Sequence, residues 1–296
     1  MKISTAEAGQ QQGQTEARSG TINVCNPPVN LMFPLLTKTF PANSDELASL
    51  LNDSIGRVFS AARSPVSVTA KAYPQLKKIH ITLDGAELRQ NPPKPPAPKG
   101  KGKPAFVVDE LGINAAGLSL GPASADLRLT AHGVHLHQAK DAAGEIILLL
   151  QRAADGQIEI SAAKDQIERG IAALAKHEAG KHGVAIEDVK LSVQPRGTRS
   201  VDAEVQLKAR KLFFSTVIRI AAKLDLDDEL NASLTGLHCA GEGAIGSLAC
   251  GFLKPHLEKL DGQTFPLMAL PLGEIRLRDV RLTAADKLTV TAEFGA

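Results

Sequence analysis

Apolar residues in this chain recur with two periods, every three or four positions in some segments and every second position in others. The first period is typical of amphipathic helices and the second of half-buried strands. Helices are predicted at about 44–62, 161–180 and 244–260. Asn43 and Glu46 have the spacing of a capping box at the start of the first one. The pattern therefore predicts three helices combined with many strands.

Residues that interrupt regular structure set the expected helix ends. Pro65 is expected to end the first helix, because proline lacks an amide hydrogen and has a fixed φ. Ser161 is a candidate N-cap for the second helix, and Gly180 is its expected stop. Pro255 removes the helical hydrogen bond to Gly251 and should kink the third helix.

The predicted strands are long. Residues 201–209 alternate strictly between apolar and polar side chains, and residues 214–226 extend the pattern beyond the usual five or six residues. Turns are expected at 155–156 and 227–228, and a phase shift indicates a bulge near 278–279. Regular hairpins of this length curl into a coiled sheet or an open barrel. Further strands are expected at 66–70, 79–83, 106–108, 111–120, 125–130, 134–137, 145–151, 186–193, 230–238, 275–282 and 288–294.

The segment 91–104 is rich in proline, lysine and glycine. It is predicted to be an extended loop, because proline is poorly compatible with helices and strands. The simpler interpretation is a solvated linker. The alternative is transient contact with an anionic membrane surface, where each cation adds about 1 kcal/mol. The lysines concerned are Lys94, Lys99, Lys101 and Lys103.

Composition narrows the class of protein without indicating a chemistry. Hydrophobic residues make up 43% of the chain and aromatic residues only 3%, so the core must consist of Leu, Ile, Val and Ala. A formal net charge of +2 is too small to favour nucleic-acid binding. Cys25, Cys239 and Cys250 are an odd number of cysteines without metal-ligand spacing. Free thiols in a reducing compartment are their simplest interpretation.

The N-terminal sequence bears on domain organisation and location. Residues 1–20 are polar and lack the apolar stretch of an export signal, which indicates a disordered tail ahead of a single domain at 21–296. No apolar run approaches the length of a membrane span. A soluble cytoplasmic protein is therefore expected, with a periplasmic location as the alternative if a leader has been removed.

Residue types that catalyse reactions or bind metals do not form a distinguishable constellation. His132, His135 and His137 lie close together, but a further zinc ligand at clear spacing is missing, so solvated histidines are favoured. The acidic turn at 225–229 lacks the glycine and terminal glutamate of a calcium loop. The run 241–246 spells G-x-G-x-x-G, but it follows a hairpin strand and no βαβ unit follows it. We therefore expect no catalytic residues, no metal and no cofactor.

Spacing and punctuation, rather than invariant motifs, carry a family resemblance that is best over 144–295 and fainter over 44–137. The runs concerned are Gly156-Gln-Ile-Glu-Ile160, Val189-Lys-Leu-Ser-Val193, Pro266-Leu-Met-Ala-Leu-Pro271-Leu-Gly-Glu-Ile275, Val280-Arg-Leu282 and Leu288-Thr-Val290, with a final Gly295. In this order they resemble the LmeA-like phospholipid-binding proteins of bacteria, which are related to the tubular lipid-binding (TULIP) superfamily. The resemblance implies an α+β fold in which a long, strongly curved antiparallel sheet wraps around amphipathic helices and encloses an apolar tunnel.

Such a fold predicts non-catalytic binding or transport of a phospholipid or fatty acyl chain. Transfer of apolar surface from water would supply the affinity, at about 0.8 kcal/mol per buried CH₂. One rival is a scaffold of the same fold with a filled core that acts through a protein partner. A less favoured rival is a lipid or ester hydrolase. The residues expected to line the tunnel are Ile167, Ile171, Leu174, Val205, Leu207, Phe214, Ile218, Ile220, Leu224, Leu248, Phe252, Leu253 and Leu257.

Overall fold

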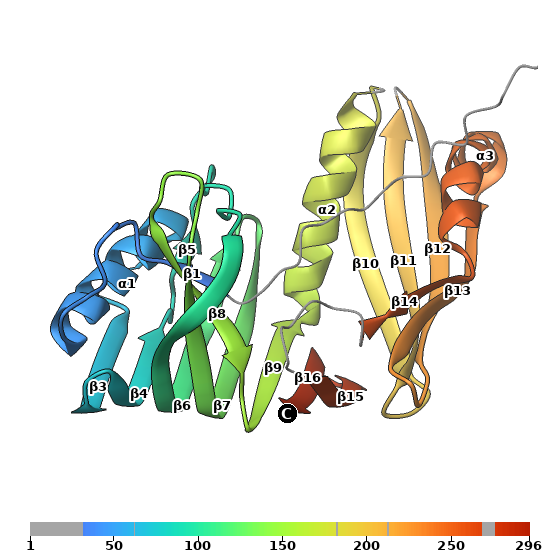
Figure 1. Cartoon of the computed structure of the whole chain (residues 1–296). Coiled ribbons are helices and arrows are strands. Elements are labelled where there is room, and N and C mark those ends of the chain that lie inside the picture. The colour runs from blue at the N-terminus through green and yellow to red at the C-terminus, as the bar shows by residue number, and fades with distance from the viewer. Residues whose placement is uncertain (1–31, 62, 182, 212, 268–275) are drawn as a thin grey trace, which may run out of the picture.

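The computed structural model describes residues 32–61, 63–181, 183–211, 213–267 and 276–296. Within them the α+β class is confirmed, with three helices and two sheets that are mainly antiparallel (Figure 1). The tail predicted at the N-terminus, Cys25 and most of the Pro266–Ile275 run lie outside the described residues.

The elements alternate between long runs of strands and single helices. In chain order they are β1 (Met32–Pro34), α1 (Ser44–Val58), β2 (Phe59–Ser60), β3 (Val66–Ala72), β4 (Gln75–Thr82), β5 (Glu87–Leu88), β6 (Lys99–Leu120), β7 (Ala123–Lys140), β8 (Ile146–Arg152), β9 (Asp155–Ala163), α2 (Lys164–Gly180), β10 (Ala185–Pro195), β11 (Ser200–Lys211), β12 (Phe214–Leu226), β13 (Asn231–Gly241), α3 (Gly243–Leu260), β14 (Gln263–Pro266), β15 (Arg276–Ala284) and β16 (Lys287–Gly295).

The described residues form two sheets, where the sequence predicted one. The large sheet has the strand order β15-β16-β9-β7-β6-β4-β3, and β1, β2, β5 and β8 pair beside this path. Its pairs are antiparallel except β4 with β6 and β5 with β6, which are parallel. The small sheet has the order β10-β11-β12-β13-β14 and is antiparallel throughout. The predicted single antiparallel sheet is therefore corrected in both number and strand direction.

Helix α1 begins as predicted. The Asn43 side chain accepts hydrogen bonds from two backbone N–H groups of the first turn, and the Glu46 carboxylate accepts one from the backbone of Ala42. Leu47 and Leu51 on its apolar stripe are completely buried against the large sheet and its neighbouring segments. The amphipathic pattern of this helix is therefore explained by packing.

Two of the predicted helix boundaries are wrong. Helix α1 ends at Val58 rather than at about residue 62, because the next two residues pair with β5 as strand β2. Ser161 does not cap α2, because it lies inside β9 with its hydroxyl directed to the Asp126 carboxylate, and the helix begins at Lys164. The helix ends at the glycine that was predicted to stop it.

Strands of the large sheet are more continuous than the alternation of apolar residues suggests. The segments predicted at 106–108 and 111–120 belong to β6, and those at 125–130 and 134–137 belong to β7. The turn predicted at 155–156 instead opens β9. The β6–β7 ladder runs through both interruptions without a shift, since Val108 pairs with Val134 and Glu110 with His132, and its register shifts lie before Phe106 and after Ala115.

Strand β6 also corrects the prediction for 91–104. Residues 92–98 contain no helix or strand, as expected, but Lys99 lies opposite Lys140 in the β6–β7 ladder and Pro104 is paired as well. Proline is tolerated here because β4 joins β6 only further along the strand. The missing N–H of the proline therefore interrupts no pairing between β6 and β4.

The small sheet agrees closely with the sequence pattern. The strictly alternating residues 201–209 lie in β11, and residues 214–226 form β12 in full. The turn predicted at 227–228 separates β12 from β13. The predicted bulge near 278–279 is confirmed in the large sheet, where the β15–β16 register shifts between Leu277 and Asp279.

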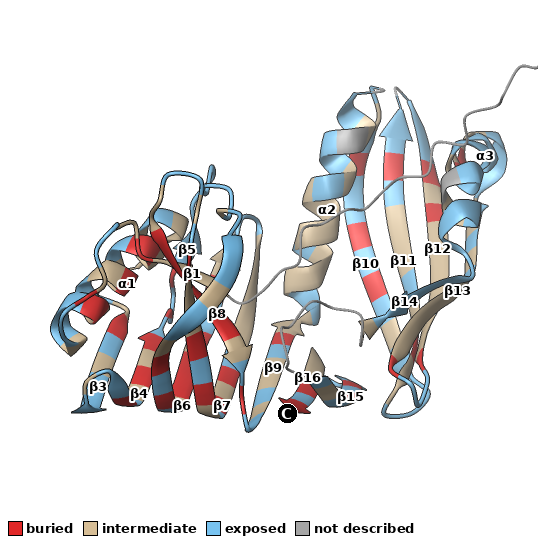
Figure 2. Ribbon diagram, viewed as in Figure 1, coloured by how far each residue is buried: buried red, intermediate tan, exposed pale blue. Residues whose placement is uncertain are grey.

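The densest core belongs to the large sheet. Leu76, Val108, Leu111 and Leu148 are completely buried and pack with α1 and the β1 segment. Figure 2 shows buried residues concentrated on the strands of the large sheet, whereas helix α3 is mostly exposed and α2 is mostly half-buried. The two sheets therefore differ sharply in how completely their apolar faces are covered.

A second cluster joins the two sheets. Leu226 and Val201 at one end of the small sheet pack with Val280 and Leu282 of β15, and all four are buried. This packing closes that end of the small sheet.

Cys239 of β13 and Cys250 of α3 form a disulfide, which corrects the interpretation of these two residues as free thiols. Their spacing alone did not indicate a pair, because they lie on different elements. The chain turns at Glu242 from β13 directly into α3, which then folds back along the strand and brings the two sulfur atoms together.

Candidate functional site

An apolar face of the small sheet is the most extensive feature that the packing leaves partly uncovered. Its alternating residues come into register across the strands. Leu191, Val205, Ile220 and Cys239 are successive cross-strand partners on β10, β11, β12 and β13, so they form one row on one face. We call the surface around this row the apolar groove.

Helix α2 forms one wall of the groove. Its residues Ile171 and Ala175 pack, as Val205 and Leu207 of β11 do, against the buried cluster of Ile186, Val189 and Ala209. On the outer flank of the helix, the Glu168 carboxylate accepts a hydrogen bond from the backbone N–H of β10, at 2.7 Å. This contact occupies the free edge of β10, which fixes α2 over the edge of the sheet.

The helical repeat then places an apolar flank of α2 over the sheet. At 100° per residue, Ile167, Ile171 and Leu174 lie together on one flank, about 60° to 120° around the helix from Glu168. Leu174 is 71% exposed, so nothing described covers it. On this flank of α2, Leu174 is therefore an uncovered apolar side chain, whereas Ile167 and Ile171 are half-buried.

Helix α3 forms the opposite wall. The disulfide attaches it to Cys239, a member of the row that crosses the sheet. Half-buried Ile245 and Leu253 lie on the flank toward β12, and Leu248 and Phe252 follow further around the helix. Leu248 is 63% exposed and Phe252 is 70% exposed. The polar residues Ser247, Lys254 and Glu258 occupy the other flank, as expected for an outer face.

Glycines bring α3 close to the sheet. A Cβ at Gly241 would overlap the backbone of Gly246, and a Cβ at Gly246 would overlap the hydroxyl of Thr216. That hydroxyl donates a hydrogen bond to the carbonyl of Glu242, at 2.7 Å. The G-x-G-x-x-G run therefore serves close packing between a strand and a helix, and Gly243 adopts a φ of +67° that favours glycine.

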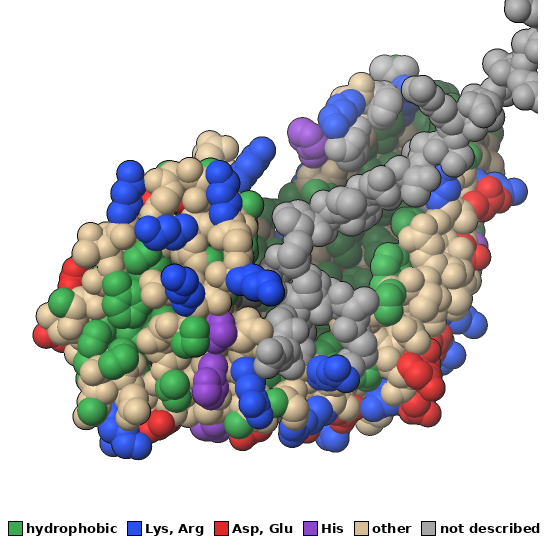
Figure 3. All heavy atoms as spheres, viewed as in Figure 1, with side chains coloured by type: hydrophobic (Ala, Val, Ile, Leu, Met, Phe, Trp, Pro, Cys, Tyr) green, Lys and Arg blue, Asp and Glu red, His purple; other side chains and the backbone are tan. Residues whose placement is uncertain are grey.

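Figure 3 shows the result as a hollow in front of the small sheet, with hydrophobic side chains on its walls. The end near Leu226 is filled by the contact with β15 and β16. The end near Phe214 reaches the β11–β12 hairpin, and Phe214 is 62% exposed. The groove is therefore closed at one end and open at the hairpin.

The structure places most of the predicted lining residues around this groove, with two exceptions. Ile218 is buried within the sheet packing, and Leu224 belongs to the cluster that joins the two sheets. Leu174, Phe214, Leu248 and Phe252 are exposed. The remaining predicted lining residues are half-buried: Ile167, Ile171, Val205, Leu207, Ile220, Leu253 and Leu257.

Sequence reasoning missed part of the apolar surface. Ile160 of β9 is 46% exposed and shares its face with Leu127 and Val290, its cross-strand partners. Strand β9 leads directly into α2, so this surface lies beside the base of the groove wall. Ile160 lies in the run 156–160 that contributes to the family resemblance, but it was not predicted to belong to the lining. The signal that could have found it is the alternation of Ile158, Ile160 and Ala162.

Charged residues lie mainly on the outer faces and at the hairpin ends. Arg199 binds Asp279 of β15 at 2.7 Å, and Arg281 binds the same carboxylate at 2.6 Å. The hydrogen bond from Arg199, followed by that from Arg281, lowers the pKa of Asp279 below its ordinary value. This cluster links the β10–β11 turn to the large sheet at the closed end of the groove.

The acidic turn after β12 has a structural role. The Asp227 carboxylate accepts hydrogen bonds from the side chain and the backbone N–H of Asn231. These bonds stabilise the charged carboxylate and lower the pKa of Asp227. Arg196 pairs with Asp225 at 2.9 Å, and Arg199 also reaches Asp228. The carboxylates are thus held by cations and amides of the neighbouring turns.

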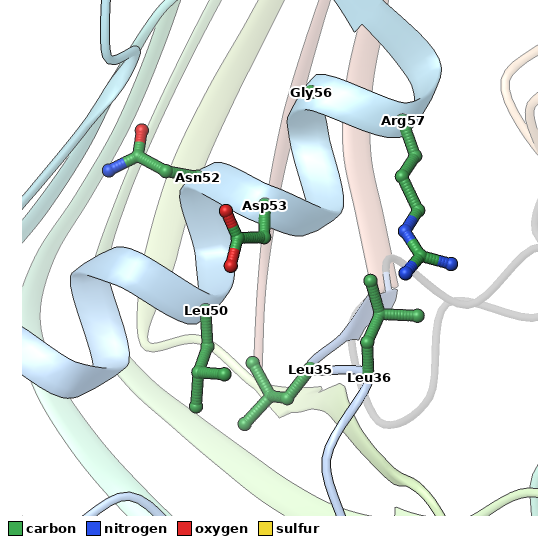
Figure 4. Close-up of a pocket in the computed structure, with 7 residues that line it drawn as sticks. All are labelled: Leu35, Leu36, Leu50, Asn52, Asp53, Gly56 and Arg57. Atoms are coloured by element: carbon green, nitrogen blue, oxygen red, sulfur yellow. The ribbon is translucent and has the colours of Figure 1, made fainter.

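Hollows elsewhere among the described residues have charged side chains in their walls. A cavity of about 470 Å³ lies beside α1, and Figure 4 shows Arg57 extending beside Leu36 while Asn52 projects from the other side of the helix. Asn52 pairs with the backbone of Val66 and so holds β3 in place. A second hollow of about 520 Å³ contains the Asp126–Lys287 ion pair, at 2.6 Å. Neither arrangement offers an apolar ligand site comparable to the groove.

The candidate metal and hydrolase residues are also placed. His132 contacts the Asp155 carboxylate at 2.7 Å, and the residues described contain no group of three or more side chains suited to a metal ion. The hydroxyls of Ser161 and Ser200 are directed to the carboxylates of Asp126 and Asp225 rather than to an imidazole. None of these contacts makes a nucleophile–histidine pair.

The predicted membrane-contact lysines lie away from the small sheet. Lys94 precedes β6, and Lys99, Lys101 and Lys103 lie in its first residues, where all four are exposed. No helix in the described part of the chain is long and apolar enough to span a membrane. Comparisons with protein-family models, curated proteins and solved structures give no match to this chain.

Proposed function

We propose that the apolar groove binds the acyl chain of a fatty acid or phospholipid, without catalysis. The single observation that carries the proposal is the row Leu191–Val205–Ile220–Cys239, an apolar sheet surface flanked by two helices that carry the exposed residues Leu174 and Phe252. Exposed apolar surface of this extent marks a binding site in soluble proteins. A flexible hydrocarbon chain suits a long floor that has few polar groups.

The energetics support a ligand held by burial alone. At about 0.8 kcal/mol per buried CH₂, about fifteen methylenes contribute about 12 kcal/mol, and a binding cost of about 4 kcal/mol leaves the roughly 8 kcal/mol that corresponds to micromolar affinity. Polar contacts are therefore not needed for micromolar affinity. The headgroup would stay outside the groove, at the open end by the β11–β12 hairpin.

The proposal also includes a tubular lipid-binding fold. Long antiparallel strands that carry helices on one apolar face are the part of the resemblance to LmeA-like and TULIP proteins on which it depends. The Cys239–Cys250 disulfide favours a site of action in an oxidising compartment, because cysteines in the cytosol are kept as reduced thiols. This supports the periplasmic alternative over the cytoplasmic one.

Two measurements test the proposal. Lipid extraction of the purified protein followed by mass spectrometry should recover an acyl-chain ligand. Titration with a fluorescent fatty acid should give saturable binding, which Ile220→Gln weakens about tenfold because its amide enters the groove floor. Ala221→Gln is the matched control, since the adjacent residue lies on the opposite face of the sheet.

The outcomes separate the rival functions. Equal affinities for the two variants would contradict the groove as the site. Absence of both co-purified lipid and fatty-acid uptake would overturn lipid binding altogether and leave a scaffold that acts through a protein partner.

A further inference from the structure

The β11–β12 hairpin carries the most exposed large apolar side chain among the described residues. Phe213 is 95% exposed, and the next residue, Phe214, is 62% exposed. Phenylalanines are normally buried, and two exposed neighbours at the tip of a hairpin create an apolar point on the surface. Their position needs an explanation that core packing does not supply.

The hairpin lies at the open end of the groove. Phe214 pairs with Lys211 and is in phase with Thr216 and Ile218, so its side chain belongs to the groove face of β12. Thr216 contacts the start of α3 through the carbonyl of Glu242. The tip therefore projects just beyond the start of the α3 wall, and a ligand that entered here would meet the groove floor directly.

Basic residues surround the apolar point. Lys208, Arg210 and Lys211 precede it in β11, and Lys211 is exposed. Lys208 and Arg210 share the single carboxylate of Glu187, at 3.3 Å and 3.1 Å. The three cations thus outnumber the one carboxylate that pairs with them, which gives this hairpin a positive charge.

We propose that the β11–β12 hairpin docks the protein on an anionic phospholipid bilayer, with Phe213 inserted among the headgroups, and so aligns the open end of the groove with the membrane. This inference rests on the proposed function for its purpose, but it concerns a separate surface. Aromatic side chains partition into the membrane interface, and neighbouring lysines and arginines are attracted to anionic headgroups.

The occupant is a bilayer rather than a second copy of the chain because of this charge. Two copies that met through their hairpin tips would bring Lys211 and its neighbours together, and like charges repel. An anionic lipid surface satisfies the same cations and buries the same phenyl rings. Self-association through Phe213 is therefore an outcome that the experiment must be able to detect.

The absence of tryptophan from the sequence permits a direct test. In Phe213→Trp the new indole is the only one in the full chain, so its emission reports the environment of the hairpin tip. Mixing with vesicles of phosphatidylcholine and phosphatidylglycerol should shift the emission to shorter wavelength, and brominated acyl chains should quench it. Phe265→Trp is the matched control, since Phe265 is 47% exposed on β14 at the other end of the small sheet.

Vesicle flotation gives the corresponding affinities. Phe213→Ser should weaken binding about tenfold or more, because one phenyl ring no longer leaves water. Lys211→Gln should weaken binding about fivefold on anionic vesicles and leave binding to neutral vesicles unchanged. Phe265→Ser should bind as the unaltered protein does.

The outcomes are distinct from those for lipid uptake. Loss of vesicle binding by Phe213→Ser with unchanged uptake of a dissolved fluorescent fatty acid supports docking as a separate step. Vesicle binding that depends on Phe213, with no fatty-acid uptake by either protein, retains docking and rejects the proposed function. Flotation unaffected by Phe213→Ser, or light scattering that shows a Phe213-dependent dimer without vesicle binding, overturns the docking proposal.

Discussion

The large sheet and the small sheet use similar strands for different purposes. In the large sheet, α1 and the β1 segment lie across the apolar residues, and Leu47, Leu76 and Leu111 are completely buried. In the small sheet, α2 and α3 stand at the edges and leave Ile220 half-buried between them. The comparison shows that the position of a helix decides whether an apolar sheet face becomes a core or a groove.

The means of attachment differ as well. Helix α1 is held by an apolar stripe that inserts into the core of the large sheet. Helix α3 is held by the Cys239–Cys250 disulfide and by the close approach of Gly241 and Gly246, while its larger apolar residues stay exposed. Because a covalent bond and a glycine contact attach this helix, its Leu and Phe side chains stay exposed and can contact another molecule.

Core truncation should give the largest difference between the sheets. Leu111→Ala is expected to lower the free energy of unfolding by about 2–5 kcal/mol, because it leaves a cavity in a fully packed core. Ile220→Ala should cost about 1 kcal/mol or less, since its side chain is only half-buried. Urea denaturation of both variants measures this contrast, and equal costs would show that the groove is a filled core.

Removal of the disulfide should act on the small sheet alone. Cys239→Ser combined with Cys250→Ser is expected to cost about 2–3 kcal/mol, because the link closes a short loop in the unfolded chain. Hydrogen exchange should rise in α3 and β13 and stay unchanged in α1 and β4. Faster exchange throughout the large sheet would instead indicate that the two sheets unfold as one unit.

Disruption of the contact between Gly241 and Gly246 should destabilise the protein nearly as much as loss of the disulfide. Gly241→Ala is expected to destabilise the protein by about 1–3 kcal/mol, because the added methyl group overlaps the backbone of Gly246. Gly251→Ala on the exposed side of α3 is the control, where nothing lies within 4 Å and helix propensity predicts a gain of about 0.5–1 kcal/mol. Thermal unfolding of the two variants should give melting-temperature shifts of opposite sign.

The ion-pair cluster between the sheets should give the smallest effect. The lowered pKa of Asp279 means that its carboxylate contributes stability above the unfolded pKa of about 3.8, and that this contribution is lost as pH falls through the folded pKa. Asp279→Asn should therefore lower stability slightly at pH 7 and have no effect well below pH 3. Denaturation across this pH range should give a shallower acid dependence for the variant, and parallel curves would contradict the linkage.

Much of this arrangement could be predicted from local sequence. The N-cap at Asn43, the stop of α2, the full length of β12 and the bulge between β15 and β16 all follow from side-chain periodicity and backbone preference. These features depend on residues close together in the chain. The same is true of the apolar row, because strict alternation in β11 requires that Val205 and Leu207 share a face.

Other features depended on contacts that local patterns do not contain. The strand pairing of Lys99–Pro104 required β7 as a partner, and the end of α1 required β5. The disulfide required α3 to fold back along β13, so the positions of the two cysteines in the sequence did not indicate that they pair. In each case a distant segment supplied hydrogen bonds or proximity that outweighed the local preference.

By itself, the sequence determined which residues are apolar, which face of each strand carries them, and that helices with apolar stripes accompany long strands. Only the tertiary structure decided that α1 covers its sheet while α2 and α3 stand apart. Periodicity specifies the direction in which a side chain points, but burial depends on where another element is placed. For that reason the apolar face of the large sheet is a core, and the equally regular face of the small sheet remains a groove.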